Sequence, residues 1–330
     1  MRIKGLELIP VSRMSHLQWL EKRQEGIGGS DVSSIIGINP WFSAIELFYQ
    51  KIGLNFSSGE HTESTFWGTV VEPVIRDVAQ YYNLKTRQYL DNHNNATKLR
   101  KIKEFPYMIR NKKHPHLLAN IDGLVNPIRN RAEQIFESKT INDKSFSKYE
   151  TIPTYHIWQI SLYMLVCEPM LKKLSAQIYY LINGNRFEGY SIRLSPKMKE
   201  IILDLTMDFW ERVEKGKEIV SMCNDPLERE QMLIEIEPDP DNTKAYGDFM
   251  TEEHKKKDEY VTTPMGNDIS TLCEMYQDVL KEGKEIQADK QAIINKVKKY
   301  MRDQSADVAE SDDFRIVWRN KLYINKKKSA

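Results

Sequence analysis

Two short apolar runs in the middle of the chain each carry an acidic residue, and this feature most constrains the fold. The first run is "LLANIDGLV", which contains Asp122, and the second is "EQIFESKT", which contains Glu137. Both runs have the length and composition of β-strands. A charge inside an apolar strand is costly unless it is paired. Each acid therefore needs a partner that the folded chain or a ligand supplies.

Glu137 and Lys139 are separated by one residue, so on a strand they point to one face and Ser138 points to the other. If Asp122 projects beside them from a neighbouring strand, two carboxylates repel unless a cation neutralises them. Oxygen ligands favour Mg²⁺, with Mn²⁺ as a substitute, and the Ser138 carbonyl can add a ligand. Lys139 can then position or deprotonate a water, or stabilise a charged phosphate. The alternative is an exposed ion pair of little value.

A third acid, Glu72, comes directly before Pro73 in "WGTVVEP". Residues 64–82 carry apolar side chains at helical spacing, beginning with Phe66, Val70 and Val74. The proline predicts that this helix begins there or kinks. A helix fixed in this way can direct Glu72 toward the sheet, whereas an ordinary helix leaves it facing solvent.

The order of the expected elements predicts an α/β (α+β) fold. Short helices over residues 15–53 precede three strands within residues 98–140, an apolar helix at "TYHIWQISLYMLVC" and two strands joined by the hairpin signal "NGN". A long helix over residues 196–222 follows. This order predicts a central mixed β-sheet flanked by helices.

The chain changes character after Asp225. The Pro/Asp-rich "EPDPDN" reads as a linker, residues 268–302 as a polar helix and "FRIVWRN" as a late strand. We therefore expect a first domain over residues 1–224, followed by an acidic linker, helical extension and terminal strand over residues 225–330.

Composition excludes few functions, but the distribution of charge is uneven. The formal net charge is +1, yet residues 98–148 carry twelve Lys/Arg and five Asp/Glu, while residues 225–259 carry five and twelve. A basic region beside a possible reaction centre suits a polyanion, although an uneven solvated surface explains it equally well. Three scattered cysteines give no zinc or disulfide framework. Without a signal-peptide core or an apolar span, we expect a cytoplasmic protein with no membrane partner.

The segment "GIGGSD" has the character of an anion site. Gly28 and Gly29 permit close backbone approach, and a helix start at Ser30 or Asp31 presents free N–H groups. A simple helix N-cap is the alternative. A dinucleotide-binding loop is excluded because the preceding "KRQE" is not a strand.

Five motifs together resemble the YqaJ-like viral recombinase family, which includes relatives of the phage lambda alkaline exonuclease in the PD-(D/E)xK nuclease superfamily. They are "GIGGSDVSSIIGINPWFSAIELFYQKIGL", "WGTVVEPVIRD", "NIDGLV", "FESKT" and "YHIWQISLYMLV". The resemblance covers roughly residues 15–220 and implies a restriction-endonuclease-like core. One departure is "IDG" where the family usually has "PDG", so that Ile121 replaces a proline while the carboxylate is retained.

The resemblance implies a role for each matching residue. Glu72, Asp122 and Glu137 match the metal-binding acids and Lys139 matches the catalytic lysine. Gln159 matches a glutamine close to the site, although a helix-face amide is its simpler interpretation. Arg23 and Ser30 match positions that contact the phosphate at a DNA 5′ end.

The resemblance also implies a function. We expect a Mg²⁺-dependent 5′-to-3′ exonuclease on linear double-stranded DNA, leaving 3′ single strands for recombination in a bacterial or phage-infected cell. The family implies a homo-oligomer, often a ring-shaped trimer, and a single-strand annealing protein as partner. A restriction or defence endonuclease with the same fold is one alternative. A non-catalytic DNA-binding or assembly protein is another.

Overall fold

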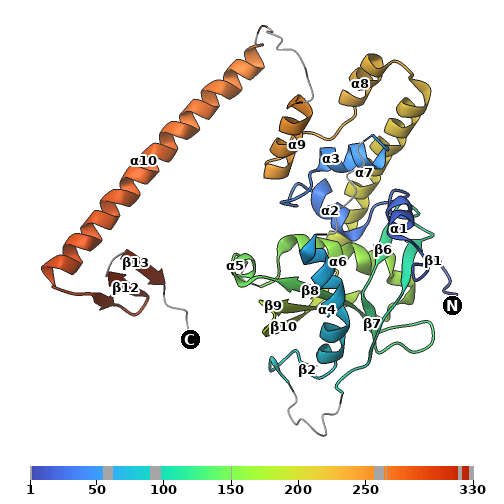
Figure 1. The fold of residues 1–330 in the computed structure, drawn as a ribbon, viewed down its shortest axis with the longest axis horizontal. Helices are drawn as coiled ribbons and strands as arrows, with labels where there is room; N and C mark the ends of the chain where they lie inside the picture. The colour runs from blue at the N-terminus through green and yellow to red at the C-terminus, as the bar shows by residue number, and fades with distance from the viewer. Residues whose placement is uncertain are drawn as a thin grey trace. The chain divides into compact units, whose positions relative to one another are not determined.

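The computed structural model describes residues 2–54, 62–89, 98–149, 151–255, 264, 266–318 and 322–326. The chain divides into two compact units, Met1–Lys257 and Asp258–Ala330 (Figure 1). The first unit extends past residue 224, where the sequence places a domain boundary. It includes helices α8 (Pro226–Ile234) and α9 (Lys244–Lys255), which bury Leu233 and Ala245.

The first unit is built around a mixed five-stranded sheet, as the sequence predicts. The strand order is β10-β9-β8-β7-β4, in which β8 and β9 are parallel and the other neighbours are antiparallel. The strands are β4 (Ile102–Lys103), β7 (Gly123–Val125), β8 (Gln134–Ile141), β9 (Ser175–Ile182) and β10 (Arg186–Arg193). An antiparallel sheet of order β1-β5-β6 lies in the same unit, formed by Leu6–Pro10, Tyr107–Asn111 and Leu118–Asn120, and a small β2-β3 ribbon by Tyr82–Asn83 and Gln88–Tyr89.

The run "LLANIDGLV" is two strands and not one, which corrects the expectation from its apolar pattern. Strand β6 pairs with β5 in the three-stranded sheet, and β7 pairs with β8 in the five-stranded sheet. Ile121 and Asp122 fall between them, and Ile121 is buried. The break places the Asp122 carboxylate where the two sheets meet, next to β8.

Helices cover both faces of the five-stranded sheet. On one face, Ile135, Ile178 and Tyr180 belong to a large core that also contains helix α6. On the other face, Phe136 and Tyr179 pack in a second core with helix α4. Besides α8 and α9, the helices described in this unit are α1 (His16–Arg23), α2 (Gly29–Ile35), α3 (Ala44–Lys51), α4 (Glu63–Ala79), α5 (Asp143–Phe146), α6 (Thr154–Val166) and α7 (Pro196–Met222), with a short 3₁₀ turn at Glu168–Met170.

Helix α4 spans Pro73, so of the two predicted alternatives it does not begin there, and the predicted kink stays a prediction. Its buried positions are Ile75 and Ala79, while the predicted stripe of Phe66, Val70 and Val74 is exposed. Both apolar stripes have helical spacing, and packing against β8 decided which one faces the core.

The hairpin signal "NGN" is confirmed. Strands β9 and β10 pair along their full length, and Asn183 and Gly184 between them both have positive φ, at 50° and 74°. Two positive φ values in succession match the twist of the flanking strands. The hairpin completes the edge of the sheet beside β8.

The second unit contains one long helix and a small sheet. Helix α10 spans Asn267–Asp303, and strands β11 (Val308–Glu310), β12 (Phe314–Trp318) and β13 (Leu322–Lys326) form an antiparallel sheet. The predicted polar helix, late strand and C-terminal appendage are thus confirmed. Among the helices described, none has the length and apolar character to cross a membrane.

Candidate active site

Glu137 is buried in the centre of strand β8 and is only partly satisfied. The residue is 2% exposed. Its Oε1 accepts hydrogen bonds from Lys139 Nζ at 2.7 Å and from Gln159 Nε2 at 3.1 Å. Its Oε2 is buried and has no hydrogen-bond partner within the described ranges. Burial, followed by repulsion from Asp122, raises the pKa of Glu137 to about 8. Among the described residues, the Oε2 oxygen of this carboxylate therefore has no donor that would stabilise its negative charge.

Lys139 lies on the same face of β8 as Glu137, as the alternation predicts. Burial acts to lower its pKa, but the charges of Glu137 and Asp122 outweigh burial and raise the pKa above its ordinary value. The side chain is accordingly an ammonium ion. In this state it donates hydrogen bonds and stabilises negative charge, and it does not take up a proton.

Asp122 reaches β8 from the junction of the two sheets. Its Oδ2 accepts hydrogen bonds from the Ser138 backbone N–H at 2.8 Å and from Ser138 Oγ at 2.7 Å. Ser138 therefore orients Asp122 through its own N–H and hydroxyl. The role predicted for the Ser138 carbonyl, as a metal ligand, stays a prediction.

Glu72 projects from helix α4 and pairs with Arg76, one turn further along. Arg76 Nη1 lies 2.7 Å from Glu72 Oε1 and also donates to the Asp122 carbonyl at 3.0 Å. Burial, then repulsion from Asp122, raises the pKa of Glu72 to about 7 despite this pairing. Sequence reasoning missed Arg76, although its i,i+4 spacing from Glu72 was a visible signal.

The carboxylates of Glu72, Asp122 and Glu137 have the chemistry of metal ligands, but they do not form a complete ligand set. Within the described ranges, no three His, Cys, Asp or Glu side chains are placed to hold a metal ion. The donors are nevertheless all oxygens, as Mg²⁺ requires, and Glu137 Oε2 is an unsatisfied buried acceptor. Glu137 and Asp122 therefore have the chemistry to hold such an ion, whereas Glu72 is paired with Arg76 in this structure.

Arg23 and Ser30, the predicted phosphate contacts, touch each other. Arg23 Nη2 lies 2.9 Å from Ser30 Oγ and 3.2 Å from Asp31 Oδ1, and the Arg23 guanidinium stacks on the Trp19 ring at 4.9 Å. The predicted start of helix α2 at Ser30 or Asp31 is late by one or two residues, because the helix begins at Gly29. Asp31 Oδ2 accepts from the Gly28 N–H at 2.9 Å and shapes this turn.

Lys51 on helix α3 contacts the turn that precedes helix α2 and holds it in place. It is buried, lies 3.0 Å from Asp31 Oδ2, and donates to the Arg23 and Gly26 carbonyls at 2.7 Å each. Burial lowers the pKa of Lys51, although the Asp31 charge opposes this. Sequence reasoning missed Lys51, because nothing in the helix "AIELFYQK" signals a contact with a turn more than twenty residues earlier.

Helix α2 packs against helix α6 at a point that only glycine allows. A Cβ added to Gly29 would lie 2.4 Å from the Tyr163 ring and 2.9 Å from Gln159 Cγ. Gln159 in turn donates to Glu137 and to Tyr163 Oη, each at 3.1 Å. The turn at residues 26–31 is therefore connected to Glu137 through the close contact of Gly29 with Gln159 and Tyr163.

Two adjoining cavities, each about 350 Å³, bring the predicted residues together. One is lined by Glu72, Asp122, Ser138 and Lys139, and the other by Arg23, Ser30, Asp122, Glu137, Lys139 and Gln159. Asp122 and Lys139 line both. The residues predicted from separate motifs thus share one continuous site.

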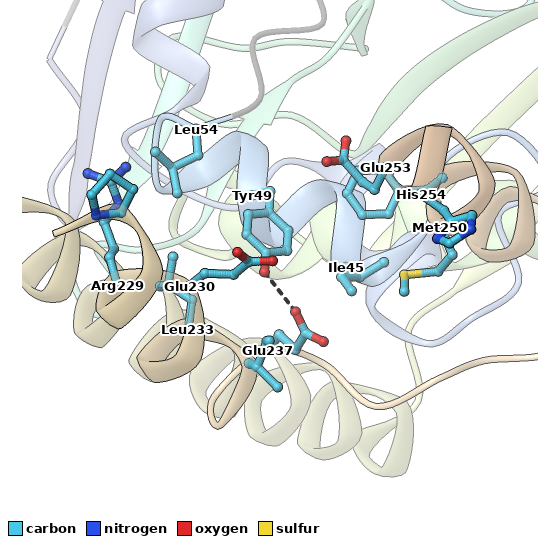
Figure 2. Close-up of a pocket in the computed structure, with 13 residues that line it drawn as sticks. Ile45, Tyr49, Leu54, Arg229, Glu230, Leu233, Glu237, Met250, Glu253 and His254 are labelled. Carbon is cyan, nitrogen blue, oxygen red and sulfur yellow. Dashed lines mark hydrogen bonds between the residues drawn. The ribbon is translucent and has the colours of Figure 1, made fainter. Parts of the chain in front are cut away.

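A larger cavity, about 630 Å³, lies between helices α3, α8 and α9 (Figure 2). Tyr49 Oη donates to Glu237 Oε2 at 2.8 Å across it, and Glu230 and Glu253 line its wall. None of the residues predicted as functional lines this cavity. Size alone therefore does not mark the reactive site of this chain.

The geometry described so far defines a mixed-sheet α/β protein with an acid–lysine centre on the middle strand of the five-stranded sheet. Residues 18–169 match the model of the YqaJ-like viral recombinase domain. This match, over a little under half of the chain, is to the same family that the sequence motifs resemble. The protein YqaJ of Bacillus subtilis (strain 168), itself uncharacterized, is 28% identical over 201 residues, which cover 60% of this chain and 56% of that protein.

Two solved structures are similar over part of the chain. The alkaline exonuclease LHK-Exo of Laribacter hongkongensis has a TM-score of 0.48 at 15% identity, covering 62% of this chain and 96% of that one. A putative exonuclease from Eubacterium rectale has a TM-score of 0.37 at 11% identity, covering 77% and 96%.

Proposed function

We propose that this protein is a Mg²⁺-dependent nuclease that degrades one strand of linear double-stranded DNA from its 5′ end. The product is a 3′ single strand suited to recombination by annealing. The observation that carries the proposal is the buried Glu137, which has one unsatisfied oxygen and a pKa of about 8 next to the Lys139 ammonium. The match of residues 18–169 to the family model supports it.

Glu137 and Asp122 would hold the Mg²⁺ ion, with Glu72 and the Ser138 carbonyl as further ligands; Mn²⁺ would substitute. A bound Mg²⁺ supplies a water of lowered pKa and stabilises charge at the scissile phosphate. Ser138 keeps the Asp122 carboxylate oriented through two hydrogen bonds. Gln159 donates to Glu137 Oε1, so Oε2 would be the oxygen that binds the ion.

Lys139 acts on the phosphate as a cation. Its raised pKa keeps it protonated, so it donates to a phosphate oxygen and stabilises the negative charge that develops in the transition state. It also faces both cavities. The alternative role of deprotonating a water requires a neutral lysine, which the neighbouring carboxylates disfavour.

Arg23 and Ser30 would bind the terminal 5′ phosphate. Arg23 provides several donors in a fixed plane, and Ser30 adds a hydroxyl. Both line the cavity that contains Glu137 and Lys139. A phosphate held there would place the first phosphodiester bond near the acids, which favours an exonuclease over an endonuclease.

End-labelled linear DNA tests the proposal. A duplex with 5′ phosphates and one labelled strand should be shortened from the 5′ end when Mg²⁺ is present, and closed circular plasmid should stay intact. Glu137→Gln should abolish digestion. The matched control is Glu133→Gln, a carboxyl near the start of β8 that pairs with Lys172 at the surface. Equal cleavage of circular and linear DNA would instead indicate an endonuclease, and unchanged activity of Glu137→Gln would disprove the assigned centre.

A ring-shaped homo-oligomer and a single-strand annealing partner belong to the same proposal. Both are properties that the family resemblance implies for this chain. Co-purification with an annealing protein from the same genome, and the mass of the assembled protein, test them separately from the chemistry.

A further inference from the structure

Helix α10 carries an apolar stripe with a regular seven-residue repeat. With positions named a to g, Leu272, Val279, Ile286, Ile293 and Tyr300 occupy five successive d positions. The a positions are Ile269, Tyr276, Gly283, Lys290 and Val297. Alternating steps of three and four residues over five heptads are the pattern of a coiled coil.

This stripe is exposed. The five d residues, with Ile269 and Tyr276, are each between 52% and 64% exposed. The stripe follows a helix of 37 residues, roughly 55 Å at about 1.5 Å per residue. A helix in a protein gains most of its stability by packing its apolar face against another element. A helix of this length whose apolar stripe faces water therefore requires a partner.

The charges along α10 identify the partner. Residues 267–289 carry six acidic and two basic side chains, whereas residues 290–303 carry five basic and one acidic. Two copies of the helix laid antiparallel place each acidic half against a basic half. Two parallel copies place like charges together. The helix is therefore complementary to itself in one direction only.

Lys290 and Gly283 support the same direction. In a parallel pair, equal positions meet, so Lys290 of one copy would face Lys290 of the other within the seam. In an antiparallel pair centred between residues 284 and 285, each a position faces a d position. Lys290 then faces Val279, and Gly283 faces Ile286.

Gly283 faces open space among the described residues. A Cβ at this position would meet no atom within 4 Å, yet glycine inside a helix costs about 1 kcal/mol relative to alanine. At the centre of an antiparallel pair, glycine lets the two backbones approach closely. We propose that α10 pairs with α10 of a second copy of this chain in an antiparallel coiled coil.

The apparent mass of the full-length protein tests the pairing. Ile286→Lys adds one lysine from each copy next to the two-fold axis of the pair, and should separate the two copies. The mass measured by light scattering should then be half that of the parent protein, even if each half is itself a ring assembled through the first unit. Ala288→Lys is the matched control, since it adds the same charge at an exposed f position and should leave the mass unchanged. Equal masses for the parent and Ile286→Lys would overturn the proposal.

Crosslinking tests the direction, and does not depend on a variant that disrupts the helix. In a chain with Cys223→Ser and Cys273→Ser, Leu272→Cys and Val297→Cys are made separately and co-expressed. An antiparallel pair brings residue 272 of one copy to residue 297 of the other, so a disulfide-linked dimer should form only in the mixture. A dimer formed by Leu272→Cys alone would show a parallel pair and refute the proposal. Neither result depends on nuclease activity.

Discussion

The acid–lysine site on β8 and the seam of helix α10 are incomplete in opposite ways. Around Glu137, charge is buried away from water and one oxygen lacks a partner. Along α10, apolar side chains face water. Each exposes the chain to a free-energy cost that a binding event removes. The nature of the cost is the reason for the ligands that we propose: a cation and phosphate at the first, and a second copy of the same helix at the second.

A third region, the Asp31–Lys51 pair, shows what a completed buried charge is like. Lys51→Met should lower the free energy of unfolding by about 3–5 kcal/mol, because it leaves Asp31 buried with only Arg23 as a cation. Chemical denaturation measures this. Lys22→Met, an exposed lysine paired with Glu25, should change it by less than about 0.5 kcal/mol. A small effect at Lys51 would mean that this pair is no more complete than Glu137.

Lys139→Ala should lower kcat by about 10²–10³, since it removes the cation proposed to stabilise the transition state. It should lower stability less than Lys51→Met, because Glu137, whose pKa is already raised to about 8, can take up a proton when its cation is removed, whereas the pKa of Asp31 is lowered. Single-turnover digestion of 5′-phosphorylated duplex measures the loss. Lys172→Ala, at the surface, serves as the control. A Lys139→Ala enzyme with parental kcat would leave the buried pair without a catalytic role.

Gly29→Ala should lower the free energy of unfolding by about 1–3 kcal/mol, because the new methyl group overlaps Tyr163 and Gln159. Gly28→Ala is the matched control: its Cβ would meet no atom closer than 3.6 Å, and its stability should be unchanged. Thermal unfolding compares the two. If Gly29→Ala were as stable as the parent protein, α2 and α6 would not be in the close contact that connects the turn at residues 26–31 to Glu137.

The Mg²⁺ requirement should weaken as pH rises from 6.5 to 8.5. The pKa values of Glu137 and Glu72, about 8 and 7, lie above the ordinary carboxyl range. At pH 6.5 both groups hold a proton that a metal must displace, and at pH 8.5 most of it is gone. Half-activating Mg²⁺ should fall by more than about tenfold, because the deprotonated fraction of Glu137 alone rises roughly 25-fold over this pH range. A requirement independent of pH would separate these acids from the metal.

The same shifts have a consequence for stability without metal. A carboxyl whose folded pKa is raised binds its proton more tightly in the folded state, so the free energy of unfolding falls as pH rises from about 4.5 to about 8. Unfolding in a chelator at these two pH values, with Glu137→Gln for comparison, measures the contribution of Glu137. The slope should be smaller in the variant.

Much of the architecture was predictable from local pattern. The hairpin at Asn183–Gly184, helix α7, strand β8 and helix α10 all follow from spacing and turn chemistry that neighbouring residues impose. The placement of Glu137 and Lys139 on one face follows from strand alternation. The division of "LLANIDGLV" between two sheets did not, because a strand break depends on which partner each half finds.

The sequence by itself determined the residues that we propose for the chemistry and the order of the secondary structure, since residue type and periodicity are local properties. Only the tertiary structure decided how the buried charges are shared between segments: Ser138 with Asp122, and Lys51 with Asp31. It also decided which stripe of α4 is buried and that Glu137 keeps one oxygen unpaired. These depend on distances between segments far apart in the chain, which packing sets and no single segment encodes.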